Sequence, residues 1–172
     1  MTKLASTEPL DPKCHSAERF DCGRPALDRW LREYAGQGQR RDTSRTFVAA
    51  GGDGAVLGYY TLVAGQVERD HTTVEVRAGT STHFPIPICL IARLAVSREA
   101  QGMGLGAGLL LDALERAVTA AELVGIRAVV VHALDEEAAS FYRHFSFAPI
   151  GSEPRTLMAP LAAVRRVVRP SE

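Results

Sequence analysis

Residues 94–110 read LAVSREAQGMGLGAGLL, and this stretch decides the fold. It joins the end of an apolar run to four glycines at alternate positions, Gly102 to Gly108, which open a long apolar helical pattern. Glycine lacks a Cβ atom, so such a loop can approach a ligand closely and adopt positive φ. The first amides of a helix have no intrahelical partners, and with the helix dipole they form an anion site suited to a pyrophosphate. The stretch therefore predicts a strand, an anion-binding loop and a helix.

The chain after this stretch alternates between helices and strands. The long helix is expected from about Gly104 to Leu123, with Gly125 ending it. The elements expected next are a buried strand Ala128–Ala133, a helix Glu136–Phe145, strands Ala148–Ile150 and Arg155–Pro160, and a short C-terminal helix. This order predicts a parallel βαβ unit in the second half of the chain.

The chain before the stretch has an antiparallel pattern. The expected elements are a helix Pro25–Ala35 ended by Gly36 and Gly38, a basic loop Gln39–Arg45, a hairpin of strands Thr46–Ala50 and Val56–Val67 around Gly51–Gly54, a polar loop Glu68–Pro87, and a buried strand Ile88–Val96. The fold class predicted from both halves is mixed α/β, with a central sheet that is antiparallel first and parallel later.

Length and composition favour an ordinary globular protein. Of the 172 residues, 46% are hydrophobic and 23% charged, which suits one domain with a sizeable core. We expect a single domain over residues 1–172, with 1–19 as an N-terminal segment and 160–172 as a C-terminal tail or helix. No apolar run approaches the ~20 residues of a membrane span, and the N-terminus lacks a signal-peptide core. These features predict a cytoplasmic protein without a membrane partner.

Cysteine usage and net charge exclude several classes. The three cysteines are odd in number and form no C-x-x-C pair, so we expect neither a disulfide framework nor a metal site. The formal net charge is zero. A nucleic-acid partner would therefore need a local basic patch, because the whole-molecule field does not attract it.

Several ligands compete for the glycine loop. A Walker loop is excluded because no Gly-Lys-Ser/Thr follows. The dinucleotide pattern G-x-G-x-x-A is satisfied by residues 102–107. However, antiparallel strands precede the loop, too little chain follows for that fold, and Asp135 lies farther on than the usual ~20 residues. A coenzyme A site and a glycine-rich helix start without any ligand are the remaining possibilities.

The segment Gln101–Gly106 resembles the pyrophosphate-binding motif Q/R-x-x-G-x-G/A of GNAT acetyltransferases. Further blocks resemble the GNAT toxins of type II toxin–antitoxin modules: Phe20–Gly23, Leu27–Leu31, Arg45–Val48, Gly58–Leu62, Pro85–Pro87, Leu94–Val96, and Val131–Asp135 with Ala138, Phe141 and Tyr142. The resemblance runs from about Phe20 to Leu161. The glycine motif alone identifies only the superfamily, whereas the combined blocks are more specific.

This resemblance implies a fold, a cosubstrate and partners. The strand ending at Leu94–Val96 should splay from the next parallel strand, and the pantetheine arm of acetyl-CoA should lie in the gap. The residues implied to bind acetyl-CoA are Leu94, Ala95, Val96, Gln101, Gly102, Met103, Gly104, Leu105, Gly106 and Phe141. The resemblance also implies acetyl transfer to the α-amine of aminoacyl-tRNA, which blocks translation, a ribbon-helix-helix antitoxin, and a homodimer.

Tyr142 matches the catalytic tyrosine of the family by its position. Amine attack on a thioester expels a thiolate, which a phenol within hydrogen-bond reach can protonate. An α-amine has a pKa of about 8, so it needs no strong general base near neutral pH. Backbone amides near Leu94 and Val96 could polarise the thioester carbonyl. The plainer interpretation of Tyr142 is a packing residue on its helix.

Basic residues near the first helix are candidates for RNA contact. Arg40, Arg41 and Arg45 can either touch tRNA phosphates or form a solvated surface. Arg93 lies inside an apolar strand, where a charge is costly unless it is paired or faces a cleft. We expect Arg93 to face the acceptor site.

Two other functions remain open on the sequence alone. One is an acetyltransferase that acts on a small-molecule or protein amine, with the same donor site. The other is a catalytically inactive module that binds coenzyme or antitoxin. The first would spare aminoacyl-tRNA, and the second would bind acetyl-CoA without transferring its acetyl group.

Overall fold

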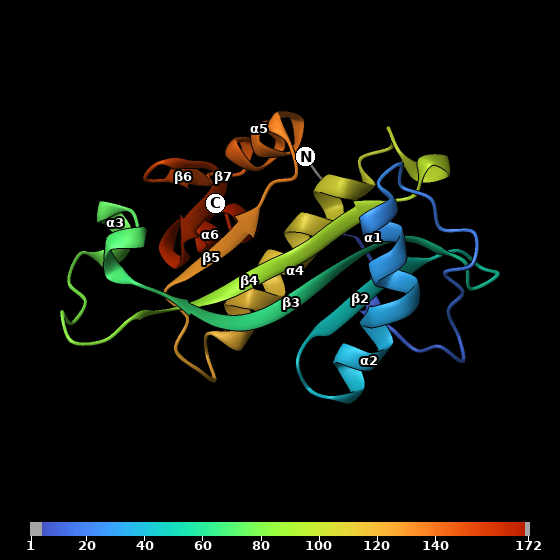
Figure 1. Ribbon diagram of the computed structural model, residues 1–172, viewed down its shortest axis with the longest axis horizontal. Helices are drawn as coiled ribbons and strands as arrows, with labels where there is room; N and C mark the ends of the chain where they lie inside the picture. Colours follow the sequence, from blue (N-terminus) through green and yellow to red (C-terminus); the bar gives the residue numbers. More distant parts are fainter. Residues whose placement is uncertain (1–4, 171–172) are drawn as a thin grey trace. The chain divides into compact units, whose positions relative to one another are not determined.

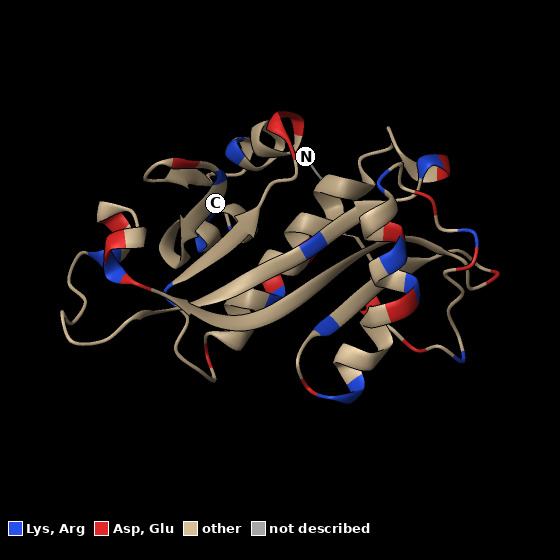
Figure 2. Ribbon diagram, viewed as in Figure 1, with Lys and Arg blue, Asp and Glu red and all other residues tan. Residues whose placement is uncertain are grey.

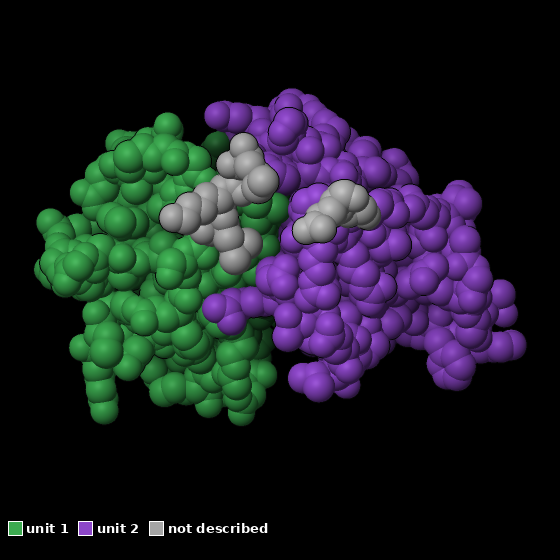
Figure 3. Space-filling view, turned by 180° about the vertical axis from the view of Figure 1, so that it is seen from behind, with its two compact units in different colours: residues 1–63, 92–113 green, residues 64–91, 114–172 purple. Residues whose placement is uncertain are grey.

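The computed structural model describes residues 5–170, so the outermost parts of the two predicted terminal segments, 1–4 and 171–172, lie outside the described residues. The chain divides into two compact units, coloured separately in Figure 3. Unit 1 comprises residues 1–63 and 92–113, and unit 2 comprises 64–91 and 114–172. The single domain expected over residues 1–172 stays a prediction.

Seven strands form one mixed sheet in the order β1-β2-β3-β4-β5-β7-β6 (Figure 1). Their bounds are β1 Glu8–Pro9, β2 Arg45–Ala50, β3 Val56–Val67, β4 Ile86–Val96, β5 Ala128–His132, β6 Ala148–Ile150 and β7 Glu153–Pro160. The pairs β1–β2, β2–β3, β5–β7 and β6–β7 are antiparallel, whereas β4 and β5 are parallel. The predicted mixed α/β class is confirmed. The two-residue strand β1 was not predicted.

The helical segment of unit 1 is longer than predicted. It comprises α1 Pro25–Arg29, a π-helical turn Trp30–Tyr34, and α2 Ala35–Arg40. Gly36 and Gly38 therefore do not end the helix, and that prediction was wrong. A Cβ on Gly38 would lie 2.2 Å from Ser44 Oγ, and the carbonyl of Gly38 accepts from the Thr43 amide at 3.0 Å. Glycine at position 38 lets the following loop approach the helix closely.

The core of unit 1 joins these helices to β2 and β3. Phe20 packs edge-to-face on Tyr59 with ring centroids 5.5 Å apart, and the Tyr59 hydroxyl donates to the carbonyl of Leu27 at 2.7 Å. Leu31 and Val48 are buried in the same cluster. Because burial of apolar side chains is the main favourable term in folding, this cluster fixes α1 on the sheet.

The start of the described chain is attached to α4, Leu105–Ala120. The Ala5 amide donates to the carbonyl of Gly108 at 3.1 Å. The buried carboxylate of Asp112 accepts from the Tyr60 hydroxyl at 2.6 Å and from the Thr7 hydroxyl. A buried carboxylate requires such partners because its desolvation is costly. Ala5 and Thr7 thus hold the start of the described chain against α4 by hydrogen bonds.

The β2–β3 turn follows the predicted hairpin chemistry, with Gly54 at a φ of 81°. A Cβ at this position would lie 2.5 Å from the carbonyl oxygen of Cys14, whereas one on Gly52 would meet nothing within 4 Å. We expect Gly54→Ala to lower the free energy of unfolding by about 2 kcal/mol or more, because both backbone strain and a clash oppose it. Urea unfolding measures this effect. Gly52→Ala in the same turn is the control, and equal losses in both variants would contradict the explanation.

Unit 2 contains the parallel strand pairing of the sheet. Residues Ile88–Ile91 of β4 pair in parallel with Ala128–Val131 of β5, and these β5 residues are fully buried. The splay expected beyond this pairing stays a prediction. The segment Glu68–Pro87, predicted as a loop, contains a 3₁₀ turn, the short helix α3 Val74–Arg77 and the start of β4. The Thr73 hydroxyl caps α3 by accepting from the Val76 amide. The C-terminal helix is α6, Leu161–Val168.

Candidate functional site

The glycine loop joins β4 to α4 within unit 1. Gly102 and Gly104 adopt φ values of 80° and 81°, a region that other residues enter at a cost. A Cβ built on either glycine meets no atom within 4 Å, and Met103 between them is 73% exposed. The loop therefore presents its backbone to open space.

The amides of this loop are available for a ligand. Among the described residues, none accepts a hydrogen bond from the amides of residues 102–106. The first helical bond runs from the Gly108 amide to the Gly104 carbonyl at 3.1 Å. Unpaired amides at the start of a 16-residue helix lie at the positive end of its dipole. This arrangement fits the diphosphate of coenzyme A.

Gln101 anchors the loop instead of pointing its amide nitrogen at a ligand. Its Nε2 donates to the carbonyls of Cys22 at 3.1 Å and Val96 at 2.9 Å. Both hydrogens of that nitrogen are thereby used. Nearby, the Arg98 amide donates to the carbonyl of Asp21 at 2.8 Å. The loop start is thus fixed to β4 and to the segment before α1, and coenzyme contact by Gln101 stays a prediction.

The predicted donor residues of β4 lead directly into this loop. Ala95 is 5% exposed, whereas Leu94 and Val96 are half-buried. The Ser97 amide that follows donates to the Leu57 carbonyl at 2.8 Å. Leu94–Val96 and residues 101–106 therefore all belong to unit 1, and their contact with acetyl-CoA stays a prediction. Of the predicted coenzyme residues, only Phe141 belongs to unit 2.

Tyr142 lies on α5, Glu136–His144, in unit 2. The Asp135 carboxylate caps this helix by accepting from the Ala138 amide at 2.9 Å. The Tyr142 ring packs edge-to-face on Phe141 at 5.2 Å and on Phe147 at 5.8 Å. Burial raises the pKa of Tyr142 to about 12. The phenol therefore stays protonated at neutral pH, as a proton donor must.

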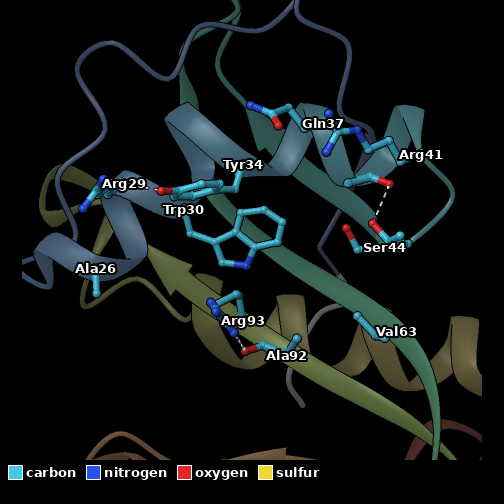
Figure 4. Close-up of a pocket in the computed structure, with 12 residues that line it drawn as sticks. Ala26, Arg29, Trp30, Tyr34, Gln37, Arg41, Ser44, Val63, Ala92 and Arg93 are labelled. Atoms are coloured by element: carbon cyan, nitrogen blue, oxygen red, sulfur yellow. Dashed lines mark hydrogen bonds between the residues drawn. The ribbon is translucent and has the colours of Figure 1, made fainter.

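The structure separates the four predicted basic residues. Figure 2 shows Lys and Arg segments along α1 and α2 and one within β4. Arg41 and Arg93 line the same pocket of unit 1, drawn in Figure 4, whereas Arg40 lines other pockets. Arg45 pairs with Asp42 at 2.5 Å and also donates to the Gln39 carbonyl at 2.7 Å. RNA contact by any of the four stays a prediction.

Sequence reasoning missed the aromatic wall of this pocket. Trp30 and Tyr34 share the helical spacing of Leu27 and Leu31, and all four read as one apolar face. In the structure Leu27 and Leu31 are buried, Trp30 is half-buried, and Tyr34 is 48% exposed. The sequence held one signal for a pocket here: Tyr34 carries a polar hydroxyl and lies near Arg29, Arg32 and Arg40 in the chain.

Across residues 5–170, no three His, Cys, Asp or Glu side chains come together in a way that could hold a metal ion. None of the described helices combines the length and the apolar character needed to cross a membrane.

Comparison with known proteins agrees with this geometry. A model of the acetyltransferase (GNAT) family matches residues 6–147. The chain is 41% identical over 149 residues to the tRNA-acetylating toxin of Mycobacterium tuberculosis, and the match covers 87% of this chain and 88% of that protein. With the family match spanning most of its length, the chain belongs to the GNAT family of acetyltransferases.

Solved structures of bacterial toxins are also similar. AtaT complexed with acetyl-methionyl-tRNAfMet has a TM-score of 0.85 and 30% identity, with 93% of this chain and 96% of that chain covered. A tyrosine-to-phenylalanine mutant of AtaT, bound to the C-terminus of the antitoxin AtaR and to acetyl-CoA, has a TM-score of 0.80 and 30% identity, with 95% and 98% covered. These neighbours share the mixed α/β fold of the chain.

Proposed function

We propose that this protein transfers the acetyl group of acetyl-CoA to the α-amine of aminoacyl-tRNA and thereby acts as a translation-blocking toxin. The observation that carries the donor half is the row of amides at residues 102–106, from which no described residue accepts a hydrogen bond. The acceptor half is supported by the identity to a tRNA-acetylating toxin. The runner-up acceptors, a small-molecule or protein amine, would use the same donor residues.

The donor site is built from backbone. The amides of Gly102 to Gly106 bind the diphosphate, and the glycines leave room for it because a Cβ at 102 or 104 would project into that open space. The backbone of Leu94–Val96 pairs with the pantetheine arm and orients the thioester. When bound, acetyl-CoA supplies a thioester carbon for the amine and a thiolate leaving group.

Tyr142 is the proposed general acid. Its phenol donates a proton to the departing sulfur, and the proton that the nitrogen loses as the amide forms restores the phenol. Its raised pKa keeps the phenol protonated at working pH. The acceptor α-amine, with a pKa of about 8, is partly neutral without help from a base. Phe141 lies half-buried beside Tyr142, and we assign it to the coenzyme contact surface.

The proposed partners follow from the same function. AtaT has been solved with the antitoxin AtaR and with a tRNA product, and we propose an antitoxin and charged tRNA as partners of this chain. We further propose that the antitoxin is of the ribbon-helix-helix type, that the toxin is a homodimer, and that it acts in the cytoplasm, where charged tRNA is found.

Incubation with labelled acetyl-CoA and total charged tRNA tests the proposal. We expect label on the α-amine of one or a few aminoacyl-tRNAs. Label on proteins or small amines only, with charged tRNA spared, would favour the runner-up.

The salt dependence of the rate tests the phosphate contacts. We expect kcat/KM to fall with rising salt, because counterions leave the RNA when cationic side chains contact its phosphates. The slope of log kcat/KM against log salt should become less negative by about one in Arg41→Gln if this residue contacts one phosphate. A kcat/KM that does not change with salt concentration would contradict the proposed phosphate contacts.

A further inference from the structure

A pocket of about 610 Å³ lies between the first helices and the sheet of unit 1 (Figure 4). It is lined by Ala26, Arg29, Trp30, Tyr34, Gln37, Gly38, Arg41, Thr43, Ser44, Val63, Ala92 and Arg93. Its volume falls within the range of ordinary small-molecule sites, roughly 300–1,000 Å³. Its lining combines cations and aromatic rings, and this combination indicates the chemistry of an occupant.

The charge of the pocket is positive. Arg29, Arg41 and Arg93 line it, and no aspartate or glutamate does. Arg29 pairs with Glu33 at 2.7 Å, but Arg41 and Arg93 have no carboxylate partner among residues 5–170. The only hydrogen bond that the Arg93 guanidinium donates to a described residue goes to the Ala92 carbonyl at 2.8 Å. Since a guanidinium has five N–H donors, most of them are available to an anion.

The aromatic rings stand beside these cations. The Arg93 guanidinium carbon lies 5.5 Å from the centre of the Trp30 ring, which holds the arginine in place by a cation–π contact. Trp30 and Tyr34 are edge-to-face with centroids 6.3 Å apart. Figure 4 shows the Trp30 ring with Tyr34 above it and Arg93 below it. Aromatic rings and guanidinium planes are the surfaces on which nucleobases stack.

We propose that this pocket binds a nucleotide, with its base stacked on the Trp30–Tyr34–Arg93 surface and its phosphate at Arg41 and Arg93. The identity of that nucleotide rests on the proposed function: it is the 3′-terminal adenosine of charged tRNA, which carries the aminoacyl ester. An amino-acid side chain alone would leave the two unpaired arginines without an anion. A nucleotide supplies both a base that stacks on the rings and a phosphate that pairs with the arginines.

The position of Arg93 in β4 suits this occupant. Arg93 precedes Val96 by three residues in a continuous strand, a span of roughly 10 Å at the usual rise of a strand. A nucleotide at Arg93 would therefore lie within about 10 Å of the backbone of Leu94–Val96, where the thioester is proposed to lie. The pocket and the donor loop share one strand, which fixes the distance between them.

Trp30 is the only tryptophan in the chain, so its fluorescence reports directly on this pocket. The full-length protein is titrated with AMP, without acetyl-CoA or tRNA, and excited at the red edge of tryptophan absorption, where adenine does not absorb. We expect saturable quenching by AMP, because a stacked base contacts the indole or its arginine. Ribose 5-phosphate and an amino-acid methyl ester should quench far less, because neither carries a base.

Two variants locate the contacts. Arg93→Gln removes one cation and should weaken AMP binding by about tenfold, and Tyr34→Leu removes one ring and should weaken it by roughly five- to hundredfold. Arg19→Gln is the matched control, because Arg19 is an exposed arginine of unit 1 that is paired with Asp53 and does not line the pocket, and its AMP affinity should equal that of the parent protein.

The outcomes separate this proposal from the proposed function. Absence of saturable quenching up to about 10 mM AMP, or stronger quenching by the amino-acid ester than by AMP, overturns the nucleotide pocket even if charged tRNA is acetylated. Saturable AMP binding that is lost in Arg93→Gln supports the pocket even if acetyl transfer to tRNA fails. Equal losses in Arg93→Gln and Arg19→Gln would also overturn it, since a general loss of positive charge would then explain the result.

Discussion

Replacing Tyr142 with phenylalanine should lower kcat by about 10²- to 10⁴-fold, the range that one positioned general acid supplies. The substitution removes a single oxygen and keeps the ring between Phe141 and Phe147. The fold and the affinity for acetyl-CoA should therefore be nearly unchanged. Steady-state kinetics and calorimetric titration with acetyl-CoA measure the two quantities separately. A turnover number equal to that of the parent protein would rule out the acid role and leave Tyr142 as a packing residue.

Tyr59→Phe is the matched control for this experiment. Tyr59 is also buried, and burial likewise raises its pKa, but its hydroxyl donates to the Leu27 carbonyl within the core of unit 1. Loss of that hydrogen bond should lower the free energy of unfolding by about 1 kcal/mol and leave kcat of the folded protein unaltered. A similar fall in kcat for both variants would indicate a general effect of removing buried hydroxyls.

The pH profile gives a second measure of the Tyr142 role. Since burial raises the pKa of Tyr142 to about 12, its proton is present throughout the ordinary pH range and is lost only as the pH approaches that value. The rate should therefore rise with pH as the acceptor amine loses its proton near its pKa of about 8, and then stay level. A fall in rate between pH 8 and 10 would contradict a tyrosine with a raised pKa as the acid.

Gly104→Val is expected to weaken acetyl-CoA binding by about a hundredfold or more. Its φ of 81° is strained for any residue with a Cβ and most strained for a β-branched one. The new side chain would also project into the open space where the diphosphate is proposed to lie. Calorimetric titration with acetyl-CoA measures the affinity, and thermal unfolding shows whether the variant is folded.

The control for the loop is Gly79→Val. Gly79 has a φ of 74°, and a Cβ there also meets nothing within 4 Å, but it lies in unit 2 after α3. Its backbone strain is similar, and it lies outside the proposed diphosphate site. Valine at position 79 should therefore lower stability as valine at 104 does while acetyl-CoA affinity is kept. If both variants bind acetyl-CoA normally, the assignment of residues 101–106 to the diphosphate is wrong.

Much of the fold could be predicted because its signals are local. The apolar runs at β3 and β5 and the glycines that follow β4 gave the strands and the loop within a few residues of their observed bounds. Periodicity does not tell a buried face from a half-exposed one: the spacing of Trp30 and Tyr34 matches that of Leu27 and Leu31, although only the two leucines are buried. Only tertiary packing separates them.

The site predictions had a similar limit. Gly38 was taken as a helix end because glycine usually signals conformational freedom, whereas here it permits a close approach to Ser44. The assignment of Gln101 to the coenzyme by its motif position stays a prediction. The sequence could not show that its side chain also binds the carbonyls of Cys22 and Val96, because these two residues lie far apart in sequence. The sequence also could not show that Asp42 pairs with Arg45 while Arg41 lines a pocket.

The attachment of the first described residues to α4 has a practical meaning for work with this protein. Ala5 and Thr7 bond to the same helix that begins at the glycine loop. A truncation that removed residues 5–7 would take one hydrogen bond from the buried Asp112 carboxylate and one from the first turn of this helix, so shortening the chain here should loosen the helix that presents the loop.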